Sequence, residues 1–326
     1  MFKKTLIAMA VASVVAAPIA SADVKISGVV EQTFTDTEND ANGMDTSTFN
    51  MLNVSASEDL GNGMSAFAKY NMLTKAGTST GEGNASTGET NGDMVVGISS
   101  GFGTIVAGTM EDFTEGKLAA MMSMEGTTAN ELSGNANRTA GGLAYVSPTM
   151  NGLHFGIAGY AGTGAADTSN FDAVDVAVFY DNGPLSIKVA QETLNNATAN
   201  VVAATAITAA GTADQKTTSI GASYVVGDLK VAALSVKREN QRVNASNAVQ
   251  ADSTDFMFKG TYKMGNNSLT LGYAKDDSDT TGDNDVTSVE LIHNFSSRTS
   301  AYVGFSNNDA TAAADDSTFF GLKHKF

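Results

Sequence analysis

The stretch Ser317-Thr-Phe-Phe-Gly-Leu-Lys-His-Lys-Phe326 decides the fold. Side chains of a β-strand alternate between its two faces, so Phe320, Leu322 and Phe326 share one face and Lys323 lies on the other. A lone amphipathic strand at a sheet edge exposes unpaired backbone groups. Pairing of this strand with the first strand would remove that edge by closing a barrel. The edge strand of a β-sandwich is the alternative that these ten residues leave open.

The first 22 residues have the composition of a secretory signal peptide. Lys3 and Lys4 precede an apolar run, and Ala20-Ser-Ala22 is a small-residue cleavage site before Asp23. Cleavage would leave one domain, residues 23–326, exported through the periplasm. The net charge would change from −16 to −18, because the segment contains two lysines and no acidic residue.

Composition and spacing argue against several classes of function. An acidic chain is a poor nucleic-acid binder. Without cysteine, and with only three scattered histidines, the sequence has no transition-metal constellation. The acidic loop 276–285 resembles a calcium loop but has Thr281 and Ser288 where the pattern requires ligands. No serine stands in a nucleophile motif. We therefore expect no enzyme activity, cofactor or dedicated metal site.

Alternation of apolar and polar residues recurs along the whole chain. Between residues 174 and 178, for example, Val174, Val176 and Val178 alternate with Asp175 and Ala177. Segments of this kind, about ten residues long and separated by turns, are typical of outer-membrane barrels. The expected short turns lie near 60–63, 101–103, 148–152, 182–184, 227–228, 265–267 and 296–298. The expected long loops are 37–45, 76–91, 111–137, 162–171, 195–215, 241–252, 276–284 and 309–316.

Fifteen connections join sixteen strands, and short turns alternate with long loops, as in transmembrane barrels. The predicted fold is therefore all-β: a 16-stranded antiparallel transmembrane β-barrel. Several motifs then resemble those of the Gram-negative general porins, in the expected order. They are Ser57-Glu-Asp-Leu-Gly-Asn-Gly63, Gly101-Phe-Gly-Thr-Ile-Val-Ala-Gly108, Tyr145-Val-Ser-Pro148 with Gly152, Gly221-Ala-Ser-Tyr224 and Phe320-Gly-Leu-Lys-His-Lys-Phe326.

This resemblance implies a homotrimer in outer-membrane lipid that passes small hydrophilic solutes and ions. It also implies that Phe326 is read by the barrel assembly machinery, and that the third long loop, residues 111–137, folds inward to narrow the pore. The acids of this loop are the expected lining of that constriction, against one base, Lys117. They are Glu111, Asp112, Glu115, Glu125 and Glu131.

The sequence departs from its relatives on the wall expected to face this loop. Porins commonly place arginine or lysine there, but three aligned positions are uncharged: Met51, Ser55 and Thr109. Lys69 and Arg138 remain as basic candidates, and Glu31 adds an acid. Acidic linings favour cations, so we predict a cation-selective channel.

Two other functions remain open. A solute-specific channel needs an aromatic track or convergent binding groups on the inner wall; Phe67, Phe179 and Phe319 are the inward candidates. A barrel with a closed pore would instead serve as a surface adhesin or receptor.

Overall fold

The computed structural model describes most of the chain after residue 22. The described residues are 23–38, 44–77, 90–113, 117–125, 138–161, 171–195, 214–240, 242–243, 248–249, 252–278, 284–309 and 316–326. The proposed signal peptide, residues 1–22, lies outside them. So do residues 114–116 and 126–137 of the third loop.

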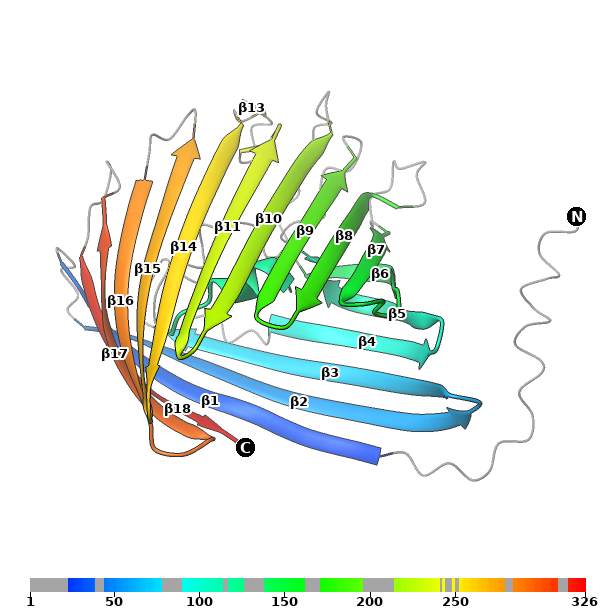
Figure 1. Ribbon diagram of the computed structural model, residues 1–326, viewed down its shortest axis with the longest axis horizontal. Coiled ribbons are helices and arrows are strands. Elements are labelled where there is room, and N and C mark those ends of the chain that lie inside the picture. Colours follow the sequence, from blue (N-terminus) through cyan, green and yellow to red (C-terminus); the bar gives the residue numbers. More distant parts are fainter. Residues whose placement is uncertain are drawn as a thin grey trace, which may run out of the picture.

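Sixteen strands form one closed antiparallel barrel, which confirms the predicted strand number and architecture. The first eight are β1 (Asp23–Thr37), β2 (Asp45–Gly61), β3 (Met64–Gly77), β4 (Thr90–Ser100), β5 (Gly103–Glu111), β6 (Arg138–Val146), β7 (Leu153–Tyr160) and β8 (Ala173–Asn182). The second eight are β9 (Leu185–Leu194), β10 (Gln215–Val226), β11 (Leu229–Glu239), β14 (Ser253–Met264), β15 (Asn267–Ser278), β16 (Asn284–Asn294), β17 (Thr299–Asn308) and β18 (Ser317–Lys325). Figure 1 shows β1 to β4 forming one wall and β7 to β15 the facing wall.

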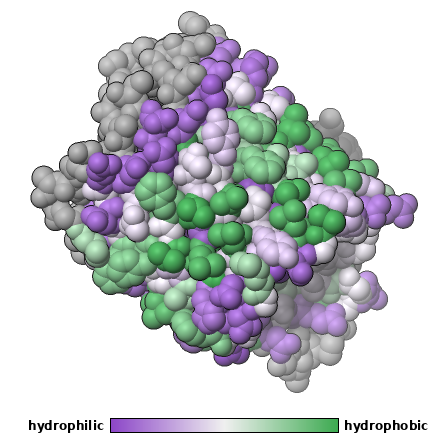
Figure 2. All heavy atoms as spheres, turned by 60° about the vertical axis from the view of Figure 1, so that its left-hand side comes forward, coloured by the Kyte–Doolittle hydropathy of each residue, from purple (hydrophilic) through white to green (hydrophobic). Residues whose placement is uncertain are grey.

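Alternating burial shows which side of each strand faces outward. In β8, Val176 and Val178 are 43% and 48% exposed, whereas Asp175 and Ala177 between them are almost fully buried. The large exposed side chains of the other strands follow the same period. Figure 2 shows apolar residues gathered in a middle zone with hydrophilic residues toward both ends. This is the outer surface of a membrane barrel, where apolar side chains face lipid.

Pairing of β1 with β18 closes the barrel. Nine residue pairs run from Val29 with Lys325 to Thr37 with Ser317. Beyond them, the Gly28 amide donates to the Phe326 carbonyl at 2.9 Å, and the Phe326 amide donates to the Gly28 carbonyl at 3.0 Å. The Phe326 ring covers Gly28 so closely that a Cβ there would lie 2.4 Å from the ring.

Three small elements of the described residues lie outside the barrel order. A 3-10 helix, η2 (Ala119–Met121), belongs to the third loop, and β12 (Arg242–Val243) pairs with β13 (Ala248–Val249) in a two-stranded sheet. Within the described ranges, no helix has the length and apolarity needed to cross a membrane.

Candidate functional site

The described part of the third loop lies against the inner wall of the barrel. Its backbone is held by side chains from strands far apart in sequence. Asp175 on β8 accepts a hydrogen bond from the Phe113 amide at 2.6 Å. Lys188 on β9 donates to the Lys117 carbonyl at 3.0 Å. Because Asp175 and Lys188 alternate with lipid-facing valines and isoleucine, these contacts are made inside the barrel.

The end of this segment is held by two more lysines. Lys259 on β14 donates to the Ser123 carbonyl at 2.8 Å, and Lys323 on β18 donates to Glu125 Oε2 at 2.6 Å. Phe113 therefore lies at β8, and the described segment 117–125 follows the inner wall from β9 to β18. An apolar cluster lies between it and the wall, with Leu118 fully buried and Met121 and Met122 nearly so.

Lys323 joins two carboxylates that are far apart in sequence. Its ammonium lies 3.1 Å from Glu31 Oε2 on β1 and 2.6 Å from Glu125 Oε2 on the loop. Glu31 also accepts a hydrogen bond from the Tyr302 hydroxyl at 2.7 Å. That hydroxyl lies 2.6 Å from Thr33 Oγ1. Two acids thus share one base, and this cluster carries a net negative charge.

The wall formed by β1 to β3 presents Met51, Ser55 and Lys69 to the interior. Met51 pairs with Val29 and Leu73, both buried. Ser55 pairs with Lys25 on one side and Lys69 on the other, while its neighbour Val54 pairs with the exposed Ile26. Three of the predicted wall residues therefore share the inner face with Glu31.

Thr109 does not face the loop, which corrects the sequence-based expectation. Thr109 pairs with Met94. The next two residues on the same face of β4 as Met94 are Val96 and Ile98, which are 59% and 44% exposed. Its neighbour Met110 is buried in the inner cluster. The register therefore puts Thr109 on the outward face. Gly108, the residue before Thr109, has φ +136°. The pairing of β5 with β6 shifts its register between Gly108 and Met110.

The remaining predicted residues have mixed placements. Asp112 is only 4% exposed, so it is a buried residue at the root of the loop and not part of an open lining. Glu111 is half-buried, and its backbone pairs with that of Arg138. Glu115 and Glu131 lie outside the described residues.

Sequence reasoning missed the lysines that hold the loop and the acids buried on the inner wall. Lys188 and Lys259 each alternate with exposed apolar residues, so the period-two pattern already placed them inside. What the pattern cannot supply is their partner, a carbonyl on a distant loop. Besides Asp175, the buried acids that the sequence pattern did not single out include Glu192, Asp255 and Glu290.

A family model described as Gram-negative porin matches residues 6–313. The chain belongs to the Gram-negative porin family. Members of this family with this fold are typically channels rather than enzymes, and they lie in the bacterial outer membrane. Within the described ranges, no group of three or more histidine, aspartate or glutamate side chains is arranged to hold a metal ion.

Solved porins share the fold at low sequence identity. The anion-selective porin from Comamonas acidovorans is 20% identical, covering 94% of this chain and 100% of its own, with a TM-score of 0.71. Salmonella typhi OmpF in complex with daunomycin is 13% identical, covering 93% and 97%, with a TM-score of 0.75. The trimer form of Vibrio cholerae OmpT is 14% identical, covering 94% and 100%, with a TM-score of 0.66. No curated protein sequence matches the chain.

Proposed function

We propose that this porin forms a water-filled channel through which ions and small hydrophilic solutes diffuse passively, without chemistry. The observation that carries the proposal is a closed 16-stranded barrel whose inner face bears charged side chains and a loop segment bound to the wall. Such a lining suits hydrated solutes, and the apolar outer face suits lipid.

The aromatic side chains do not favour a solute-specific channel. Phe179 and Phe319 point inward but are 2% and 0% exposed. Phe179 is covered by the edge of Phe113 and stacks on His154. Phe179 and Phe319 are packed against protein, so they offer no stacking surface to a passing sugar. Phe67, the third candidate, is half-buried, and its ring lies against Gly97 of β4.

Planar-bilayer recording tests the proposed function against both alternatives. We expect a conductance that rises linearly with salt concentration and is not saturated by any one sugar. Saturable block by one solute would indicate a specific channel. A correctly folded barrel that gives no conductance would indicate an adhesin or receptor and would refute the proposal.

We also propose that the channel prefers cations. Glu31 and Glu125 share a single lysine, and Met51 and Ser55 are uncharged on the inner wall formed by β1 to β3. We propose that Glu111, Glu115 and Glu131 also line the constriction. Arg138 and Lys69 are the basic residues proposed for the wall that faces them. The preference should be modest, because Lys188 and Lys259 lie along the same loop.

The zero-current potential in a potassium chloride gradient should have the sign of potassium permeation. The preference should weaken from 0.1 M to 1 M salt, because the screening length falls from about 10 Å to about 3 Å. Ser55→Arg, which adds a base to the inner wall, should move the potential toward anions. Asp228→Asn removes an exposed charge from the turn before β11 and should change it much less. A wild-type potential of anionic sign would refute the cation preference.

Assembly and processing are proposed from the resemblance and from the trimer form of the related OmpT. We propose a homotrimer of chains cleaved before Asp23, with Phe326 recognised by the assembly machinery. Native mass spectrometry of the detergent-extracted protein should give three copies of a chain that starts at Asp23. A monomer mass would contradict the trimer, and a mass that includes residues 1–22 would contradict the cleavage.

A further inference from the structure

Many residues of the inner wall behind the third-loop segment have very small side chains. They come from β6 to β15 and most belong to the same buried cluster as Leu118 and Met121. The alanines are Ala144, Ala158, Ala173, Ala177, Ala190, Ala232 and Ala274, and glycines lie among them. The described loop segment lies against this part of the wall.

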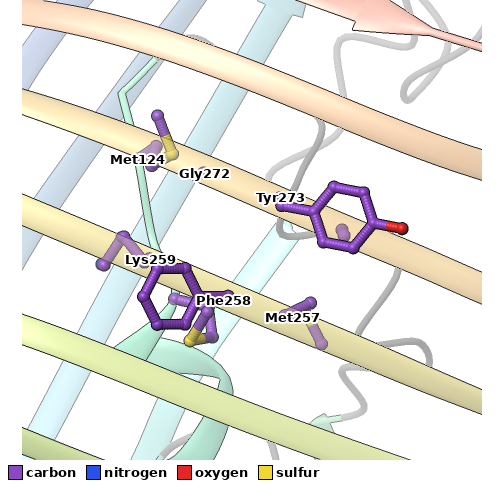
Figure 3. A pocket seen from close by; sticks show the side chains of 8 residues that line it. Met124, Met257, Phe258, Lys259, Gly272 and Tyr273 are labelled. Carbon is purple, nitrogen blue, oxygen red and sulfur yellow. The ribbon is translucent and has the colours of Figure 1, made fainter.

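Three inward glycines of this wall are in close contact with three loop side chains. A Cβ on Gly156 of β7 would lie 2.4 Å from Cζ of Phe113. One on Gly221 of β10 would lie 3.2 Å from Sδ of Met121, and one on Gly272 of β15 would lie 2.7 Å from Sδ of Met124. Figure 3 shows Met124 beside Gly272. The beginning, middle and end of the segment therefore each lie against a glycine, where an added Cβ would push the facing loop side chain aside.

These contacts limit how closely the loop segment can approach the wall, and the hydrogen bonds do not. Lys188, Lys259 and Lys323 reach the loop with long side chains, which adjust by rotamer changes as the loop moves. The Phe113 ring is rigid and Met121 is buried, so at their contacts an added methyl group displaces its neighbour. Met124 is flexible, so an added methyl group at Gly272 pushes the Met124 side chain away from the wall. The glycines therefore fix how deeply the segment lies in the wall.

We infer that Gly156, Gly221 and Gly272 set the bore of the channel by letting the third-loop segment lie deep in the wall. This inference rests on the proposed channel function. A larger side chain at any of the three moves the loop, or the side chain facing it, toward the open lumen. Pore diameter governs which solutes pass and how fast. These glycines are thus determinants of the size limit, although none of them need touch a solute.

Gly272→Val is the test variant, measured by single-channel conductance and by the size of neutral polymers that enter the pore. We expect conductance to fall roughly 1.5-fold or more and the polymer size limit to decrease, as a narrower pore requires. Gly260→Val is the matched control. Gly260 lies on neighbouring β14 between the exposed Phe258 and Tyr262, and a Cβ there meets nothing within 4 Å. Its conductance should remain that of the wild type.

The double variant Gly272→Val with Met124→Ala separates displacement of the loop from other effects. Removing the Met124 side chain makes room for valine, so conductance should return toward the wild-type value. If Gly272→Val does not fold, Gly272→Ala is measured instead, because its single added carbon already falls within 2.7 Å of Met124 Sδ.

Wild-type conductance in folded Gly272→Val would overturn the inference. A reduced conductance that the double variant with Met124→Ala does not restore would overturn it too. A wild-type protein that does not conduct at all would refute the proposed function instead.

Discussion

Deletion of Phe326 is expected to lower the amount of folded barrel in the outer membrane by about tenfold or more, because each orphaned backbone group in lipid costs several kcal/mol. The deletion removes both hydrogen bonds between Gly28 and Phe326 and uncovers Gly28. The measurement is the heat-modifiable, folded band in outer-membrane fractions. Normal levels of the truncated protein would contradict both the closure argument and the proposed recognition by the assembly machinery.

Phe326→Ala separates the ring from the backbone bonds. It keeps the two hydrogen bonds with Gly28 and loses only the ring that covers that glycine. We expect an intermediate level of folded protein. Phe295→Ala is the control, since that outward ring is 63% exposed and takes no part in the pairing of β1 with β18.

Arg238→Leu is expected to destabilise the barrel by about 3–5 kcal/mol, the usual cost of leaving a buried charge without its partner. Arg238 on β11 donates to Asp255 on β14, and the two side chains are 7% and 1% exposed. The urea midpoint of barrels folded in lipid vesicles measures the change.

The double variant Arg238→Leu with Asp255→Leu tests the cause of that loss. It replaces the whole pair by apolar groups, so it should recover much of the lost stability. A double variant as unstable as Arg238→Leu would show that the loss comes from other contacts of the arginine.

The fold was predictable because period-two alternation is a local property. Val176 and Val178 alternate with Asp175 and Ala177 in the sequence, and the structure places the two sets on opposite faces of β8. The sixteen strands followed from counting such segments and the turns between them. The turn at 61–63 is built as its sequence indicated, with Gly61, Asn62 and Gly63 all at positive φ.

The candidate site was less predictable because its contacts depend on register and on distant segments. Thr109 was assigned to the inner wall by alignment, yet its pairing with Met94 turns it outward beside a register shift that no local pattern reveals. Asp112 was counted among the open acids, but it is buried at the root of the loop. Lys323 gains its two partners only when β18 meets β1 and the described loop segment lies against the inner wall.

The pairing of β1 with β18 also bears on when the protein can fold. Val29 meets Lys325, so the contact that completes the sheet joins segments almost the full length of the chain apart. Contacts between such distant segments slow folding, because the entropy of loop closure is lost before the contact forms. Until β18 has been delivered, the growing sheet has two open edges that can pair with other chains. The rate of assembly, and the risk of aggregation during export, should therefore depend on how quickly the end of the chain reaches its beginning.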